Sequence, residues 1–265
     1  MPELPDVEIY RRRFERSTRG RRVEGVEARD SQVLVGVGGR RLDRDLRGVR
    51  FTGTQRRGKT LYGVTTDGPH LRLHFGMTGD LVVLDKGPCQ GEPRHTRVVF
   101  GLSGGRRLLF VDQRRLGEVG VVQDVDADIA DHDLGPDALD LAPPELASLL
   151  RKSQAGLKAF LVDQSQLAGL GNIYTDEILF QARLDPRTAA ADVGDSGVRR
   201  LHRQLHRVVD RAVAAEADPQ AMPRGWLIHR RDDGAACPRG NGSIRSFSVG
   251  GRRGYWCQGC QAGRR

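Results

Sequence analysis

The pattern of apolar residues changes from strand-like to helical near residue 130, and this change limits the folds open to the sequence. From about residue 23 to residue 122, short runs of β-branched and aromatic residues are separated by glycine-containing turns. Several short strands at this spacing are typical of an antiparallel sandwich. After Asp131 the strand signals stop and apolar residues recur at helical spacing. The sequence therefore predicts an α+β protein, with strands over residues 33–37, 49–54, 60–65, 71–75, 81–84, 98–102, 107–111 and 117–122.

A helix is predicted before the β region. Val7, Tyr10 and Phe14 recur at helical spacing between Glu3 and about Thr18, and arginines occupy the other faces. The fold should thus begin with an N-terminal helix attached to the β-sandwich.

The second half of the chain is predicted to be helical until about residue 225. One helix should begin near Pro143, and a later amphipathic helix carries its apolar face through Leu201 and Leu205. From Trp226 onward the chain is rich in glycine and arginine, and residues 244–249 and 254–256 read as the arms of a β-hairpin. We therefore expect three domains, over residues 1–130, 131–225 and 226–265.

The charge balance points to a polyanionic partner. The chain has 43 Lys and Arg against 34 Asp and Glu, a net charge of +9 and a pI near 10.0. Nucleic acid is the leading candidate. No stretch approaches the apolar length of a membrane span, and the N-terminus has no hydrophobic signal segment. We expect a soluble cytoplasmic protein with no membrane partner.

The first residues combine a nucleophile with an acid. Removal of Met1 would leave a secondary amine at Pro2, bonded to the residue that carries the Glu3 carboxylate. An α-amino group has a pKa of roughly 7.7 to 8, so part of it is neutral near neutral pH and able to form a Schiff base with an aldehyde-like carbon. The alternative is that these two residues simply open the helix.

Three of the four cysteines, Cys237, Cys257 and Cys260, lie in the last part of the chain. Four cysteines in a chain of 265 residues do not form a disulfide framework. Their clustering predicts a small terminal module.

Three sequence blocks, together with the N-terminus, carry a family resemblance. They are Arg57-Gly58-Lys59, the run from His74 to Gly79, and the run from Ala168 to Glu177. In this order they resemble the bacterial formamidopyrimidine-DNA glycosylase and endonuclease VIII family of base-excision repair enzymes. The resemblance covers nearly the whole chain, and its last block looks like the family's helix-two-turn-helix motif. It implies a DNA glycosylase and AP lyase that acts on double-stranded DNA carrying damaged bases or abasic sites.

The resemblance also implies roles for the first of the matched residues. Pro2 would attack the sugar, Glu3 would move protons, and Lys59 belongs to the same catalytic set. Asp6 stands where the family usually has glutamate and is the candidate residue of the lesion pocket.

Further matched positions would bind the DNA. Lys59, Lys158 and Asn172 match positions that contact phosphates around the flipped nucleotide, and Arg252 matches the arginine at the tip of the terminal hairpin. Met77 would fill the space left by the extruded base, with Arg114 and Leu116 facing the orphaned base.

Two departures from the family pattern concern the terminal module and the base pocket. The module resembles the family's zinc finger, but Gly240 occupies the expected fourth ligand position beside Cys237, Cys257 and Cys260. Structural zinc is almost always four-coordinate, so the sequence favours a degenerate, metal-free finger, with bound zinc as the alternative. The segment between about residues 215 and 226 is too short for the long loop of the family members that prefer oxidised purines. We therefore expect a more open pocket or a preference for other damage.

These observations, with the resemblance, predict a repair enzyme that excises damaged bases, with oxidised bases as the expected class, and nicks the abasic strand through a Schiff base. It would need no organic cofactor, because the amine belongs to the chain. We expect a monomer associated with the nucleoid. The rival prediction from another class is a non-catalytic protein of the same fold that binds damaged DNA or abasic sites.

Overall fold

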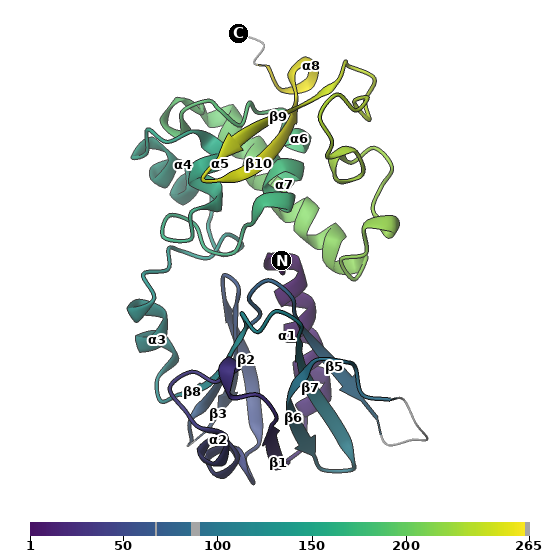
Figure 1. Ribbon diagram of the computed structural model, residues 1–265. Helices are drawn as coiled ribbons and strands as arrows, with labels where there is room; N and C mark the ends of the chain where they lie inside the picture. The colour runs from purple at the N-terminus through teal and green to yellow at the C-terminus, as the bar shows by residue number, and fades with distance from the viewer. Residues whose placement is uncertain (67, 86–90, 263–265) are drawn as a thin grey trace. The chain divides into compact units, whose positions relative to one another are not determined.

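The structure is a computed structural model that describes residues 1–66, 68–85 and 91–262. The chain divides into two compact units (Figure 1). The first comprises residues 1–2 and 6–133, and the second comprises residues 3–5 and 134–265. The boundary between residues 133 and 134 lies close to the predicted boundary near residue 130. The further division at residue 225 remains a prediction.

The first unit contains two four-stranded antiparallel sheets, with strand orders β1-β6-β7-β5 and β2-β3-β4-β8. Side chains from both sheets share one apolar core, which includes Phe75, Phe100 and Phe110. The predicted antiparallel β-sandwich is confirmed. Its strands are β1 (Val23–Ala28), β2 (Phe51–Arg57), β3 (Thr60–Thr65), β4 (His70–His74), β5 (Gly79–Leu84), β6 (Thr96–Leu102), β7 (Arg106–Asp112) and β8 (Glu118–Val122).

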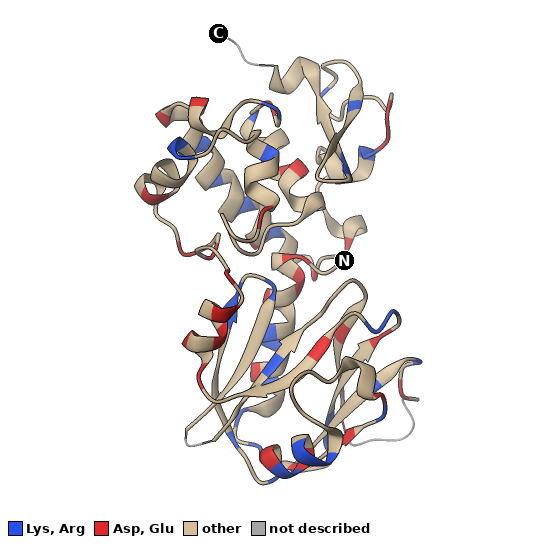
Figure 2. Cartoon of the chain, turned by 60° about the vertical axis from the view of Figure 1, so that its left-hand side comes forward, with Lys and Arg blue, Asp and Glu red and all other residues tan. Residues whose placement is uncertain are grey.

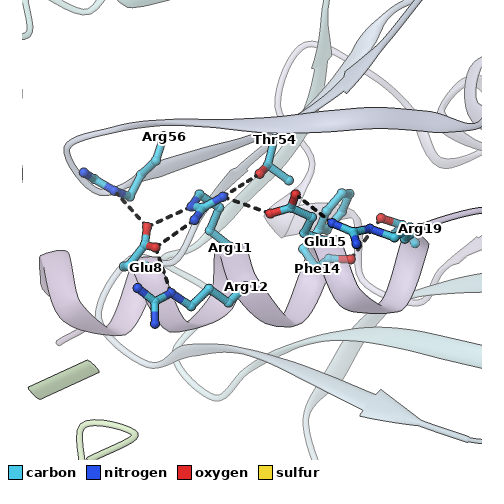
Figure 3. Close-up of polar contacts among 9 residues, drawn as sticks. Glu8, Arg11, Arg12, Phe14, Glu15, Arg19, Thr54 and Arg56 are labelled. Atoms are coloured by element: carbon cyan, nitrogen blue, oxygen red, sulfur yellow. Dashed lines mark hydrogen bonds and ion pairs between the residues drawn. The ribbon is translucent and has the colours of Figure 1, made fainter. Parts of the chain in front are cut away.

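Helix α1 (Leu4–Thr18) confirms the predicted N-terminal helix. Its apolar residues Val7, Tyr10 and Phe14 are buried in the core of the sandwich. The polar face is fixed as well, since Arg11 donates hydrogen bonds to Glu8 at 2.8 Å and to Thr54 of β2 at 3.0 Å (Figure 3). Burial would raise the pKa of Glu8, but hydrogen bonds from Arg11 and Arg12, together with the charges of Arg11 and Arg56, outweigh burial and lower it. The helix that begins just after Pro2 is therefore anchored on both faces.

One predicted strand is wrong, and two helices and one strand were not predicted. Residues 33–37 do not form a strand, because a 3-10 helix (Ser31–Val33) ends there and Gly36 adopts a positive φ of 67°. Helix α2 (Gly39–Leu46) follows, burying Leu42 and Leu46, which are four residues apart. Strand β1 and the acidic helix α3 (Val125–Asp131) complete the first unit (Figure 2).

The second unit is helical and ends in a two-stranded hairpin. Helices α5 and α6 are joined by residues 163–171, within the segment where the helix-two-turn-helix motif was predicted. The hairpin arms are close to those predicted. The elements are α4 (Pro143–Arg151), α5 (Leu157–Val162), α6 (Asn172–Ala182), α7 (Asp195–Ala214), β9 (Ile244–Val249), β10 (Arg252–Cys257) and α8 (Gln258–Gln261), with 3-10 helices at Ala190–Asp192, Pro219–Ala221 and Leu227–Arg230.

Candidate DNA-processing site

Glu3 is buried against the beginning of helix α6. Only 2% of the residue is exposed, and its carboxylate accepts hydrogen bonds from the backbone N–H groups of Ile173, at 2.8 Å, and Tyr174, at 3.0 Å. Helix N-termini favour anions because their first N–H groups lack partners within the helix. The carboxylate next to Pro2 is therefore held by the motif from Ala168 to Glu177.

Gly171 makes this arrangement sterically possible. A Cβ atom at this position would lie 2.2 Å from Cδ of Glu3. The neighbouring backbone helps to hold the same segment, since the N–H of Leu4 donates to the carbonyl of Gly169 at 3.1 Å. Gly171 thus leaves room for the Glu3 side chain, and the Gly169 carbonyl holds the backbone that follows it.

The other catalytic candidates lie in the first unit. Pro2 is half-buried and precedes α1, and Asp6 lies in the first turn of that helix. Lys59 follows Gly58 in the turn between β2 and β3, where Gly58 has a positive φ of 55°. A tight turn of this kind presents Lys59 at the end of the strand pair.

Two loops of the first unit carry Met77, the predicted void-filling residue, and Arg114 and Leu116, which are predicted to face the orphaned base. Met77 is 39% exposed and Leu116 is 49% exposed, although both are large apolar side chains. The loops pack closely, since a Cβ atom on Gly76 would lie 2.3 Å from the carbonyl oxygen of Leu116. Arg114 is exposed in the second of these loops. The structure therefore brings Met77, Leu116 and Arg114 onto adjoining loops.

Asp112 joins these loops and was not identified from the sequence. It is fully buried, and its carboxylate accepts hydrogen bonds from the Thr78 hydroxyl at 2.5 Å, the Gly117 N–H at 2.7 Å and the Arg114 N–H at 3.2 Å. A buried carboxylate requires such donors. The only sequence signal was an acidic residue at the end of an apolar strand.

The phosphate-binding candidates of the second unit gather where the hairpin meets α6. Asn172 is the first residue of α6, and its side-chain amide donates to the carbonyl of Arg253 at 3.0 Å. Arg252 is exposed at the start of β10, directly after the turn at Gly250 and Gly251. Lys158 is buried, with 1% exposure, and its ammonium group lies 2.5 Å from the carboxylate of Asp176.

Burial acts in opposite directions on the two members of this ion pair. It lowers the pKa of Lys158 and raises the pKa of Asp176, while their mutual attraction opposes both shifts. Asp176 was not among the predicted site residues, although it lies within the sequence block that resembles the helix-two-turn-helix motif.

The sulfur atoms of Cys237, Cys257 and Cys260 lie within 4.8 Å of one another, close enough to hold a metal ion together. Over the described ranges 1–66, 68–85 and 91–262, no His, Asp, Glu or other Cys joins them. The side-chain amide of Asn241, next to Gly240, donates to Cys260 Sγ at 3.3 Å. These residues supply three of the four ligands of a structural zinc site and do not close it.

Comparison with known proteins agrees with this geometry. The family model for the formamidopyrimidine-DNA glycosylase N-terminal domain matches residues 1–119, and the model for the H2TH domain of the same proteins matches residues 134–222. The chain belongs to the formamidopyrimidine-DNA glycosylase family. The resemblance inferred from the sequence blocks is therefore confirmed.

Individual relatives of this glycosylase family are similar over nearly their whole length. The formamidopyrimidine-DNA glycosylase of Moorella thermoacetica is 36% identical, over 98% of this chain and 92% of the relative. That of Symbiobacterium thermophilum is 34% identical, over 98% and 89%. Among solved structures, Lactococcus lactis Fpg in complex with DNA containing an abasic site has a TM-score of 0.83 and 25% identity, covering 98% of this chain and 99% of the other.

No helix within the described residues combines the length and apolarity needed to cross a membrane.

Proposed function

We propose that this protein is a base-excision repair DNA glycosylase with AP lyase activity, which works through a Schiff base on Pro2. Its family membership, its net charge of +9 and its similarity to Lactococcus lactis Fpg bound to abasic-site DNA support this function. The main supporting observation is the buried Glu3 carboxylate, fixed by α6 next to the nucleophile.

The proposed chemistry needs only groups of the chain and the substrate. After removal of Met1, the Pro2 nitrogen attacks the anomeric carbon and forms a C–N bond, while the bond to the damaged base breaks. Glu3 takes up the proton that the Pro2 nitrogen loses and gives it to the ring oxygen as the sugar opens, which leaves an iminium ion on Pro2. The base departs with the electron pair of its bond and takes a proton from water. Loss of a proton from the adjacent sugar carbon then expels the 3′ phosphate, and water hydrolyses the imine. Lys59 would be the third catalytic residue, beside Pro2 and Glu3.

Binding is assigned to residues of both units. Lys59, Asn172 and Arg252 would contact phosphates, and Lys158 would reach a phosphate only by exchanging its Asp176 partner. Met77 would occupy the space left by the extruded base, with Arg114 and Leu116 facing the orphaned base. Asp6 would line the lesion pocket.

The expected substrate is an oxidised base in double-stranded DNA. The protein would act as a monomer at the nucleoid in the cytoplasm. The short segment after α7 favours lesions other than 8-oxoguanine opposite cytosine. Duplexes that each carry one defined lesion test this preference, which strong selective excision of 8-oxoguanine would contradict. No organic cofactor is required, and a zinc ion at Cys237, Cys257 and Cys260 would have only a structural role.

Borohydride trapping on an abasic duplex tests the central proposal. The wild type should form a covalent adduct, and Pro2→Gly should form none. Pro5→Ala, a change three residues further along, is the matched control and should trap normally. Tight binding of the wild type without an adduct would favour the non-catalytic binding protein, and base release without nicking would favour a monofunctional glycosylase. Retention of Met1, detected by mass spectrometry of the intact protein, would contradict the covalent route.

A further inference from the structure

The terminal hairpin is attached to α6 by two hydrogen bonds of matching spacing. Asn172 donates to the carbonyl of Arg253 at 3.0 Å, and the N–H of Tyr255 donates to the carboxylate of Asp176 at 3.0 Å. On the helix the two side chains are four residues apart, a rise of about 6 Å, and on the strand the two backbone groups are two residues apart, about 6.6 Å. Strand β10 is therefore held along one turn of α6.

Asp176 is the centre of this attachment. Asp176 is 1% exposed, and one of its carboxylate oxygens lies 2.5 Å from Lys158 Nζ. The other oxygen accepts hydrogen bonds from the Arg231 guanidinium and the Tyr255 N–H. Breaking a buried ion pair by removing one partner is costly, because the remaining charges stay desolvated. Without the Asp176 carboxylate, two cations would face each other beneath the hairpin.

Lys158 fits beneath the hairpin because Gly254 has no side chain. A Cβ atom on Gly254 would lie 2.6 Å from the Lys158 ammonium and 2.8 Å from the ring of Phe247. The ammonium also lies 5.5 Å from the centre of the Phe247 ring, within the range of a cation–π interaction. The buried cation thus contacts the hairpin as well as Asp176.

The far end of the module is attached beside the position where the fourth metal ligand is missing. The guanidinium group of Arg239, next to Gly240, stacks 4.1 Å from the centre of the Phe180 ring. It donates to the Phe180 carbonyl at 2.9 Å and to the Gln181 side chain at 2.7 Å, at the C-terminal end of α6, where a cation is favoured. The module therefore contacts both ends of α6 through side chains.

We propose that Asp176 is a positioning residue that holds the DNA-binding hairpin on α6, and that the hairpin keeps this position without a bound metal. The anchor is the group Asp176, Lys158, Arg231 and Asn172, with Arg239 as a second attachment. Asp176 acts on the DNA through Arg252 at the hairpin tip. This role rests on the proposed DNA-repair function.

The test measures binding of the full-length protein to a duplex that contains an uncleavable tetrahydrofuran abasic analogue. Asp176→Asn should weaken binding roughly tenfold and raise KM on a natural abasic duplex, while kcat at saturating DNA stays within about twofold. Asp176→Glu, which keeps the charge, should recover part of the affinity. Val208→Ala in the buried core of α7 is the folding control, which should lower Tm and leave DNA affinity intact.

The second arm removes metal from the wild type with EDTA and phenanthroline, with metal content followed by mass spectrometry. Affinity and Tm should remain unchanged. The proposal is overturned if Asp176→Asn binds the duplex with an affinity within about twofold of the wild type. It is also overturned if removal of metal from the wild type weakens DNA binding roughly tenfold.

Should Asp176→Asn fail to fold, Gly254→Ala provides the same test, because its methyl group would displace Lys158 and Phe247. Normal DNA affinity in a folded Gly254→Ala variant would also overturn the proposal. Binding to the uncleavable duplex needs no chemistry at Pro2. Its outcome is therefore distinguishable from failure of the glycosylase proposal, which borohydride trapping decides.

Discussion

Gly171 controls whether the Glu3 carboxylate can occupy the start of α6. In Gly171→Ala, the new methyl group would overlap the Glu3 side chain and displace it from the N–H groups of Ile173 and Tyr174. Since a positioned acid contributes about 100-fold or more, we expect kcat on an abasic duplex to fall by roughly that factor. Single-turnover kinetics measure the change.

Gly194→Ala is the matched control for this substitution, because no atom lies within 4 Å of a Cβ placed at Gly194. Its rate should equal that of the wild type. A Gly171→Ala enzyme with normal single-turnover rates would show that the observed Glu3 position is not needed for catalysis.

Asp112 offers a prediction of stability. Asn in its place has one oxygen instead of two and cannot accept equally well from Thr78, Arg114 and Gly117. Hydrogen bonds to a buried charged group are worth about 1.5 to 3 kcal/mol, so we expect Asp112→Asn to lower the free energy of unfolding by about 2 kcal/mol. Urea denaturation measures this loss. Asp80→Asn, at a half-exposed ion pair with Arg13, should change stability by less than about 1 kcal/mol.

The residues that the sequence did not identify have partners far away in the chain. Pro2 and Glu3 were recognisable because they are adjacent, but the contact of Glu3 with Ile173 spans 170 positions. Asp112 and Asp176 likewise bond to groups from other elements. A local pattern cannot reveal which buried acid will meet those donors.

At the scale of elements, Glu177 couples α6 to the segment before the hairpin. Its buried carboxylate accepts from the N–H of Ile228 at 2.9 Å and from Gln181 at 2.6 Å. Burial raises its pKa from 4.5 to about 7. Between these values the folded state binds more protons than the unfolded state. The contribution of Glu177 to stability is therefore fully present below about pH 4.5 and is lost as the pH rises through about 7.

Glu177→Gln should remove this part of the pH dependence. Between pH 5 and pH 8 the stability of the wild type should fall relative to the variant by about 3 kcal/mol, the value of a shift of this size. Urea titrations of both proteins at several pH values measure the difference. Parallel profiles would show that Glu177 ionises normally in the folded protein.

The elements that the sequence predicted well have strong local periodicity. Helix α1 repeats Val7, Tyr10 and Phe14, and the hairpin arms flank a Gly-Gly turn at residues 250–251. Helix α2 was missed because it begins with glycine and carries only two apolar residues, Leu42 and Leu46. The run over residues 33–37 resembled a strand in composition, but the positive φ of Gly36 ends any extended segment.

For the whole molecule, the net charge of +9 predicts that DNA binding weakens steeply with salt. Each phosphate neutralised by a cation releases counterions and contributes about one to the slope of log affinity against log salt. Lysine and arginine occur on elements of both units, so the charge is not confined to one of them (Figure 2).

Arg252→Ala should therefore reduce this slope by about one and weaken binding at moderate salt, with the same loss on undamaged and abasic duplexes. Fluorescence anisotropy at several salt concentrations measures both quantities. Arg40→Ala, which removes an exposed arginine on α2, is the control and should leave the slope unchanged if that surface stays away from DNA. An unchanged slope in Arg252→Ala would show that the hairpin tip makes no phosphate contact. Equal decreases in both variants would show that the slope depends on overall charge and not on a particular contact.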